Sequence, residues 1–250
     1  MPEQGPQPYL SIVLPAYNEE NRLPPSLETI VAFMQTKNYS WEIVVVDDGS
    51  RDRTSQVAEQ VLAGTPHTVL RNDPNRGKAL SVRRGLTESR GQVALFSDAD
   101  LSTPIEEADP LLAAIEQGAD LAIASRQMKG SVIELRQPWY RQFGGLAFSV
   151  INRVVLLPGI PDSQCGFKAF RREAIERIFP HQQLTGWAFD AELLFIARRL
   201  GLTIAQIPVR WINSPDTRVN MLVDGPRMVR DLFRIRWLHR RLRPAHQENQ

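Results

Sequence analysis

The sequence has 250 residues and a net charge of +2, and 42% of its residues are hydrophobic and 23% are charged. These values are ordinary for a soluble globular protein and allow one large α/β domain or two small ones. The single cysteine, Cys165, excludes an internal disulfide and a cysteine-rich zinc site. The first ten residues lack a basic and an apolar region, and no stretch reaches the ~20 apolar residues of a bilayer span. We therefore expect neither a signal peptide nor a transmembrane helix.

Short β-branched runs alternate with helical patterns in the first half of the sequence. Strands are expected at 10–14, 43–46, 93–96 and 121–124, and helices at 26–36, 54–63, 78–89 and 105–117. Gly64, Gly91 and Gly118 follow three of these helices, where a left-handed C-cap residue is favoured. This alternation predicts an α/β fold with an open, mostly parallel sheet flanked by helices.

The second half of the sequence lacks this regular alternation of predicted strands and helices. A helix is expected at 139–156, a turn-rich segment at 158–170, helices at 172–178 and 189–200, and a late strand at 203–209. The division expected is a disordered arm at 1–8, one domain at 9–220, a basic amphipathic helix at 221–243 and a tail at 244–250.

Acidic residues directly follow two of the predicted strands. Asp47 and Asp48 end one run, and Asp98 and Asp100 follow another in SDADLS. Ligands of open α/β sheets bind beyond the carboxyl ends of the strands. Two carboxylates, completed by water and substrate phosphates, suit Mg²⁺ or Mn²⁺. Asp98 and Asp100 therefore predict a metal site, and a purely structural capping role is the alternative.

The segments PAYNEE, DDGS, NRGKA, SDADLS, ASR, DSQCGFKAF and GWAFDAELL occur in this order between residues 15 and 194. In order and spacing they resemble the family 2 inverting glycosyltransferases of the GT-A fold. The resemblance covers about residues 10–220 and is strongest to the dolichyl-phosphate glucosyltransferases and the dolichyl-phosphate mannose synthases. DSQCGFK followed by GWAFDAEL favours the glucosyltransferase branch.

The resemblance implies a nucleotide-diphosphate-sugar donor, a polyprenyl-phosphate acceptor, Mg²⁺ or Mn²⁺ as cofactor, and a role for residues in each segment. Pro15, Tyr17, Glu19 and Asp48 would hold the nucleobase and ribose, Lys78 would flank the nucleotide, and Asp98 and Asp100 would bind the metal. Arg126 and Arg141 would meet phosphate groups, and Asp162 and Gln164 would shape the acceptor pocket. Arg218 stands where relatives often carry a lysine that contacts phosphate.

The kind of acceptor decides whether a base is needed. A lipid phosphate is already an anion at neutral pH, so positioning by arginine would suffice. A sugar hydroxyl needs a general base, for which Asp190 is the candidate. Helix capping is the structural alternative for Asp190, since it lies near the start of a predicted helix.

Basic residues are concentrated near the C-terminus. Residues 227–243 contain seven arginines and one acid, and the rest of the chain carries 23 basic against 27 acidic side chains. Met228, Leu232, Ile235 and Leu242 fall on one helical face, with Val229 and Phe233 beside them. A basic amphipathic helix of this kind is typical of membrane interfaces. We expect a cytoplasmic protein bound peripherally to the cytoplasmic face of a membrane, with packing of this face on the domain as the alternative.

Other functions stay open or are excluded by motif. The alternatives are a transferase using GDP-mannose or a glycan hydroxyl acceptor, and a non-catalytic nucleotide-binding module. The sequence contains neither G-x-G-x-x-G nor G-x-x-x-x-G-K-[ST], which excludes a dinucleotide oxidoreductase and a P-loop NTPase of the usual kind. The basic C-terminal segment lacks an accompanying nucleic-acid recognition motif, so no nucleic-acid partner is expected.

Overall fold

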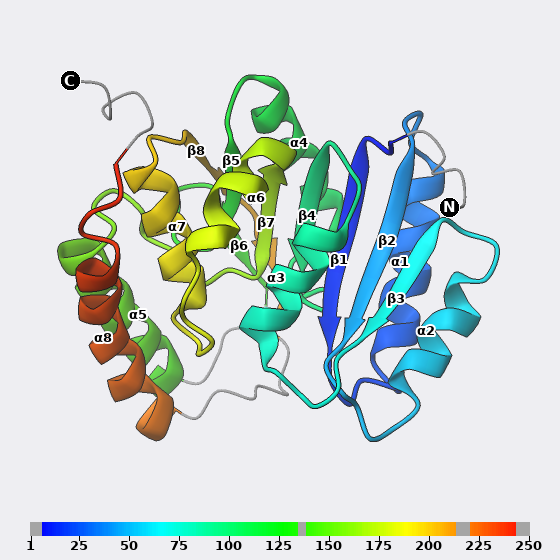
Figure 1. Ribbon diagram of the computed structural model, residues 1–250, viewed down its shortest axis with the longest axis horizontal. Coiled ribbons are helices and arrows are strands. Elements are labelled where there is room, and N and C mark those ends of the chain that lie inside the picture. The colour runs from blue at the N-terminus through cyan, green and yellow to red at the C-terminus, as the bar shows by residue number, and fades with distance from the viewer. Residues whose placement is uncertain (1–6, 135–138, 214–220, 244–250) are drawn as a thin grey trace.

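The structure, a computed structural model, describes residues 7–134, 139–213 and 221–243, with side chains from residues 143 and 223 onward in the last two ranges. Within these residues the main element is a seven-stranded sheet with helices on both faces (Figure 1). Its strands are β1 (Leu10–Ala16), β2 (Trp41–Asp47), β3 (His67–Arg71), β4 (Val93–Ser97), β5 (Leu121–Ser125), β7 (Phe167–Arg171) and β8 (Ile204–Pro208). They lie in the order β3-β2-β1-β4-β7-β5-β8.

Strand β7 is the antiparallel member of this sheet. It pairs antiparallel with β4 and with β5, whereas the other neighbouring strands pair in parallel. The register places Ser97, the last residue of β4, opposite Phe167, the first residue of β7. The start of β7 therefore lies at the edge where the parallel strands end.

A two-stranded parallel ribbon of β6 (Val132–Ile133) and β9 (Arg210–Trp211) lies beside this edge. The Ile212 amide, just after β9, donates to the Ser102 carbonyl at 2.7 Å. This bond ties the ribbon to the turn that follows β4.

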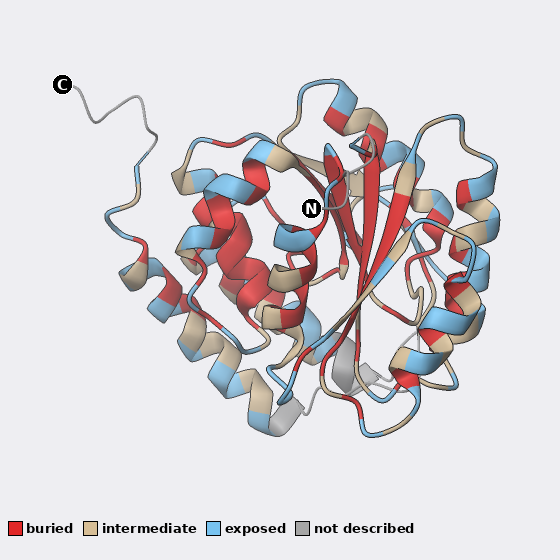
Figure 2. Cartoon of the chain, turned by 45° about the vertical axis from the view of Figure 1, so that its right-hand side comes forward, coloured by how far each residue is buried: buried red, intermediate tan, exposed pale blue. Residues whose placement is uncertain are grey.

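Helices cover both faces of the sheet, and the strands between them are buried (Figure 2). On one face lie α3 (Lys78–Glu88), α6 (Arg172–Ile178) and α7 (Phe189–Arg199), with α5 (Trp139–Val155) and α8 (Met221–Leu238) outside them. On the other lie α1 (Leu23–Gln35), α2 (Thr54–Leu62) and α4 (Ala108–Glu116). Short 3₁₀ turns occupy Ile105–Glu107 and Phe179–His181. Alternate residues of each strand supply the two cores, as in β1, where Val13 faces one and Ile12 the other.

The predicted α/β class, with a mostly parallel sheet and a C-terminal helix, is confirmed. The helix predicted at 172–178 matches α6, and the other predicted strands and helices match to within a few residues. The division into arm, domain, helix and tail stays a prediction, and residues 1–6 and 244–250 lie outside the described ranges.

The structure differs from the sequence interpretation at three points. The segment at 158–170 contains most of β7, because its turn-forming residues end at Gly166 and the run from Phe167 pairs with β4 and β5. The strand β3 was not predicted. Gly91 does not adopt a left-handed conformation, unlike Gly64 and Gly118. It is required for space instead, since a Cβ there would lie 2.6 Å from the Ser11 nitrogen.

The apolar face predicted for the C-terminal helix packs mainly on the domain. Leu232 and Ile235 of α8 are fully buried against the core that includes α7. Phe233 and Trp237 point outward instead and are 57% and 62% exposed. No helix within the described ranges is long and apolar enough to cross a bilayer.

Candidate active site

The two predicted metal ligands lie at the carboxyl end of β4. The Asp98 amide donates to the Gly166 carbonyl at 3.0 Å, so the start of β7 fixes the backbone here. One Asp100 carboxylate oxygen accepts the Ser102 amide at 3.0 Å, across a turn whose central residue, Leu101, has a φ of +47°. Both acids are partly exposed. This turn holds the second carboxylate at the same strand end as the first.

Lys78 brings a cation to these acids. It is the first residue of α3, and its ammonium lies 2.5 Å from an Asp98 carboxylate oxygen. Burial lowers the pKa of Lys78, but the carboxylates of Asp98, Asp190 and Asp100 outweigh it and leave that pKa raised. Asp98 thus offsets the unfavourable position of a lysine at a helix N-terminus.

The loop before Lys78 is organised by Asp48. Its carboxylate is almost fully buried and accepts the side-chain amide of Asn72 at 2.8 Å and the backbone amides of Arg76 at 2.9 Å and Gly77 at 2.8 Å. Asp48 therefore determines how the chain enters α3. Its predicted contact with the nucleotide stays a prediction.

The other residues predicted to hold the nucleoside lie at the end of β1. Pro15 is the penultimate residue of β1 and, like Tyr17, is partly exposed. Glu19 is buried and pairs with Arg22 through two contacts of 2.7 Å, while its amide donates to the Thr54 hydroxyl at 2.8 Å. These contacts fix the loop that presents Tyr17 next to the end of β2.

Arg126 and Asp162 form a forked ion pair beyond the end of β5. The Arg126 Nε and Nη2 atoms lie 2.7 and 2.9 Å from the two Asp162 oxygens, and its guanidinium is 5.3 Å from the centre of the Trp211 ring. Burial raises the pKa of Asp162, but Arg126 outweighs it and holds that pKa below its usual value. The Gln164 amide also donates to Asp162, at 3.1 Å. The predicted phosphate-binding arginine and the predicted acceptor residues are therefore neighbours.

Asp190 lies in a buried ion pair with Lys168, to which the sequence interpretation gave no role. The Lys168 ammonium lies 2.6 Å from an Asp190 oxygen, and Lys168 is fully buried. Burial raises the pKa of Asp190, and the opposing effects of Lys168 and Lys78 leave it raised. A base at this position would have to act with one oxygen engaged by an ammonium. The pairing escaped the sequence because the strand that carries Lys168 was interpreted as a turn.

Three further predictions from the sequence concern Cys165, Arg218 and Arg141. Cys165, expected to be a packed small residue, is 1% exposed, and burial raises the pKa of its thiol to about 11. Arg218 lies outside the described residues, as does the side chain of Arg141, whose backbone belongs to α5.

The donor set at this edge fits a divalent ion that shares its ligands with a substrate. Asp98 and Asp100 would supply two hard oxygen ligands, and Lys78 and Arg126 lie near enough for their charges to act on Asp98. The described residues contain no cluster of three or more acidic, histidine or cysteine side chains suited to a metal. Substrate oxygens and water would therefore complete the ligand shell, as is usual for Mg²⁺ beside phosphates.

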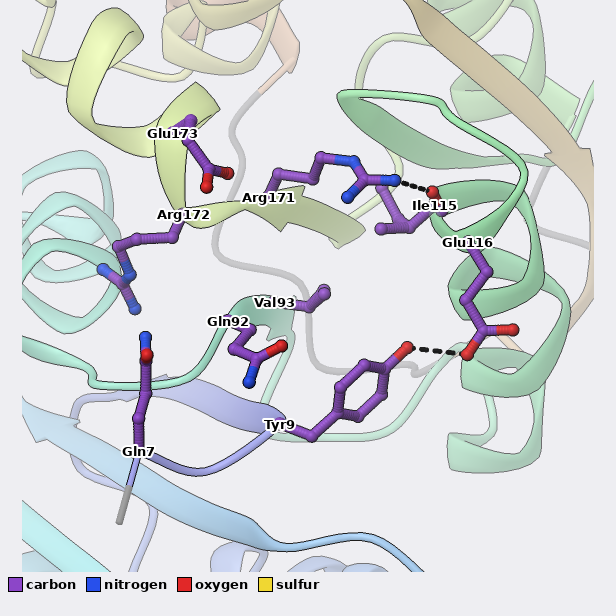
Figure 3. A pocket seen from close by; sticks show the side chains of 9 residues that line it. All are labelled: Gln7, Tyr9, Gln92, Val93, Ile115, Glu116, Arg171, Arg172 and Glu173. Atoms are coloured by element: carbon purple, nitrogen blue, oxygen red, sulfur yellow. Dashed lines mark hydrogen bonds between the residues drawn. The ribbon is translucent and has the colours of Figure 1, made fainter. Parts of the chain in front are cut away.

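A cavity of about 330 Å³ lies at the opposite edge of the sheet (Figure 3). Its polar groups bind one another and the backbone: the Tyr9 hydroxyl donates to Glu116 at 2.8 Å, and Arg171 Nε donates to the Ala119 carbonyl at 2.9 Å. Since the acids of SDADLS lie at the other edge, this cavity is not part of the candidate site.

Residues 11–179 match the family described as Glycosyl transferase family 2. The chain belongs to this family. It is 36% identical to a dolichyl-phosphate beta-glucosyltransferase of Trichomonas vaginalis over 91% of this chain and 70% of the relative. The chain thus belongs with the dolichyl-phosphate beta-glucosyltransferases and is a nucleotide-sugar glycosyltransferase.

Solved structures show the same fold. The mannosyl-3-phosphoglycerate synthase of Rubrobacter xylanophilus aligns with a TM-score of 0.72 at 21% identity, over 97% of this chain and 78% of that one. The glucosyl-3-phosphoglycerate synthase of Mycobacterium tuberculosis, solved with Mn²⁺, UDP-glucose and phosphoglyceric acid, aligns with a TM-score of 0.68 at 22% identity, over 90% and 78%. The predicted GT-A fold is confirmed.

Proposed function

We propose that this chain transfers glucose from UDP-glucose to a dolichyl-type polyprenyl phosphate, with inversion at the anomeric carbon and with Mg²⁺ or Mn²⁺ as cofactor. The observation that carries the proposal is the match to relatives named for β-glucosyl transfer to dolichyl phosphate. A structural neighbour that binds UDP-glucose with Mn²⁺ supports the choice of donor and metal.

The reaction we propose is a single displacement. An oxygen of the acceptor phosphate attacks the anomeric carbon of glucose while the bond from that carbon to UDP breaks, and UDP leaves with the electron pair. The acceptor is already an anion, so no proton has to be removed from it. Negative charge accumulates on the departing diphosphate, and fixed positive charge is the means to stabilise it.

The residues at the strand ends would have different roles in this reaction. Asp98 and Asp100 would hold the divalent ion, which when bound neutralises charge on the diphosphate. Lys78 would turn its ammonium from Asp98 toward the same phosphates. Arg126, oriented by Asp162 through a forked pair, would face the acceptor phosphate, for which a planar guanidinium is suited.

The position of Asp190 favours a phosphate acceptor over a sugar hydroxyl. Its carboxylate is buried and bound to Lys168, whereas a general base needs an oxygen within hydrogen-bond reach of the acceptor hydroxyl. A phosphate acceptor needs no general base.

We further propose that α5 and α8 dock on the membrane that carries the acceptor. These helices pack side by side (Figure 1), and the Arg236 guanidinium of α8 donates to the Val155 carbonyl at 2.8 Å. Phe143, Leu146, Val150 and Val154 share one face of α5 and are each between 49% and 76% exposed. Such a contiguous apolar stripe beside exposed arginines suits an anionic lipid surface.

The test is transfer by purified protein to a short polyprenyl phosphate. UDP-glucose and GDP-mannose are compared as donors, with Mg²⁺, with Mn²⁺ and with chelator, and free sugars are compared as acceptors. We expect transfer of glucose to the lipid phosphate only with a divalent ion, and strong loss of activity in Asp98→Ala and Asp100→Ala. Preference for GDP-mannose, transfer to free sugars alone, or full activity with chelator would contradict the donor, the acceptor or the metal respectively.

A further inference from the structure

Lys168 is a buried cation that the reaction proposed above does not use. It is the second residue of β7, and it is 0% exposed. Its ammonium donates to the Asp190 carboxylate at 2.6 Å and to the Cys165 carbonyl at 2.5 Å. A charge removed from water in this way is costly unless it is paired, so a lysine here points to a specific task.

Two ion pairs of opposite charges involve Lys168 and the predicted metal ligand Asp98. Asp98 pairs with Lys78 at 2.5 Å, and Asp190 pairs with Lys168 at 2.6 Å. The Asp98 carboxylate, and with it the Asp190 carboxylate, raises the pKa of Lys78. Asp98 and Asp190 therefore compete for Lys78, and Lys168 neutralises one of the two competitors.

Both lysines border the same aromatic ring. The Lys78 and Lys168 ammonium groups lie 5.4 and 5.9 Å from the centre of the Phe96 ring, which is 1% exposed. The surroundings of the two ion pairs are thus partly apolar. Charge interactions are stronger in such surroundings than in water, so the loss of one partner is felt by the others.

The same lysine also supports the backbone beside Asp98. Its ammonium holds the carbonyl of Cys165, and the next residue, Gly166, accepts the Asp98 amide at 3.0 Å. A Cβ at Gly166 would lie 2.1 Å from an Asp98 oxygen, so the carboxylate lies directly against this glycine. The turn into β7 and the Asp98 side chain are therefore fitted to each other.

We propose that Lys168 is a positioning residue that engages the Asp190 carboxylate, so that Lys78 remains at the donor site near Asp98 and can bind the diphosphate of the donor. The inference rests on the proposed function for the identity of that donor. Lys78 is, with Lys168, a cation whose charge acts on the buried Asp190, so without Lys168 the Asp190 carboxylate draws Lys78 away from the donor site. Nucleotide affinity then falls although no residue that contacts the nucleotide has changed.

The test is calorimetric titration of UDP, with Mn²⁺ present, into wild type, Lys168→Met, Lys168→Arg and the double variant Lys168→Met/Asp190→Asn. We expect Lys168→Met to bind UDP at least about tenfold more weakly, a difference of about 1.4 kcal/mol. Lys168→Arg keeps the charge and retains most of the affinity. The double variant removes both charges of the pair and returns to within about threefold of wild type, since neutral replacement of a buried pair is well tolerated.

Lys37→Met is the matched control. Lys37 pairs with Asp109 at 2.7 Å and is the same kind of side chain in an ion pair of similar length. It lies between the end of α1 and the start of β2, whereas the predicted metal ligands follow the end of β4. Its UDP affinity should equal that of wild type. Far-ultraviolet circular dichroism and thermal melting of each variant separate loss of affinity from loss of folding.

The results that would overturn the inference are distinct from those that test the function. Wild-type affinity in folded Lys168→Met would overturn it, and so would a double variant that is folded but binds UDP at least about tenfold more weakly than wild type. If Lys168→Met does not fold, the double variant alone decides. Failure of the wild type to bind UDP would instead contradict the proposed donor.

Discussion

Two regions of the molecule are built on different principles. On the proposed donor side, at the ends of β1, β2 and β4, the acids are held by short hydrogen bonds, and the Asp48 carboxylate binds two backbone amides of the loop before α3. On the proposed acceptor side, α5 and α8 present apolar and basic side chains to the outside, including Phe143 at 69% and Val154 at 76% exposure. A preorganised polar site suits a small charged donor, and an exposed apolar surface suits a substrate that stays in a bilayer.

The largest expected effect concerns the proposed donor side, which depends on the negative charge of Asp100. Asp100→Asn keeps an oxygen for the Ser102 amide but removes the negative charge, so we expect kcat to fall by at least about 10²-fold with little loss of stability. Steady-state transfer assays and urea unfolding measure the two effects. Asp109→Asn, an exposed acid paired with Lys37, is the control and should keep full activity. Activity within about threefold of wild type would show that Asp100 is only a cap.

A second test concerns the rigidity of the donor side. Asp48→Ala leaves the amides of Arg76 and Gly77 and the Asn72 side chain without their acceptor. We expect the free energy of unfolding to fall by about 3 kcal/mol, as measured by urea denaturation. Asp109→Ala, which removes an exposed acid, should cost less than about 1 kcal/mol. Equal losses in the two variants would mean that the loop before α3 does not depend on Asp48.

The acceptor side is tested by polar substitution on α5. We expect Phe143→Ser/Val154→Ser to bind vesicles of phosphatidylcholine and phosphatidylglycerol at least about tenfold more weakly in sedimentation assays, because apolar area is lost from the contact. Transfer to a detergent-dispersed short acceptor should be unchanged. Val132→Ser, which alters an exposed valine of β6, is the control. Unchanged vesicle binding in the double variant would contradict docking through α5.

The smallest expected effect lies at the edge strand β3, away from both sides of the site. Burial lowers the pKa of His67, but the Thr65 carbonyl and Glu59 outweigh it and leave that pKa raised. The resulting stability is fully present below the unfolded pKa of about 6.5 and is lost as pH rises through the folded value. We expect a contribution below about 1 kcal/mol, seen as a stability decrease between mildly acidic and mildly alkaline pH that His67→Gln abolishes and Glu59→Gln reduces. An unchanged slope in His67→Gln would contradict this assignment.

Sequence patterns predicted β1, β2, β4, β5 and β8, because each is a short, mostly apolar run, but they missed the parallel strand β3. Asp98 and Asp100 could be placed at a strand end for the same reason. The register of β7 could not be predicted, since its residues follow a run of turn formers and its partners β4 and β5 precede it by dozens of residues. The pair of Lys168 and Asp190 depends on that register and was missed with it.

For a related reason, the sequence left open whether the apolar face of the C-terminal helix meets lipid or protein. Helical spacing identifies which residues share a face, but the burial of Leu232 and Ile235 is decided by the surface of α7, which lies far away in the sequence. Periodicity alone does not distinguish a face that meets lipid from one that meets protein.

The insertion of β7 between β4 and β5 has a consequence for how the molecule is made. During synthesis β1, β2, β3 and β4 can pair as soon as they emerge, but β5 has β7 and β8 as its neighbours and must wait for residues up to Arg171 and beyond. Until then the edge of β4 is open, and unpaired edges of this kind invite association with other chains. The strand β7, whose start lies against Asp98, is thus also the strand that covers the open side of β4.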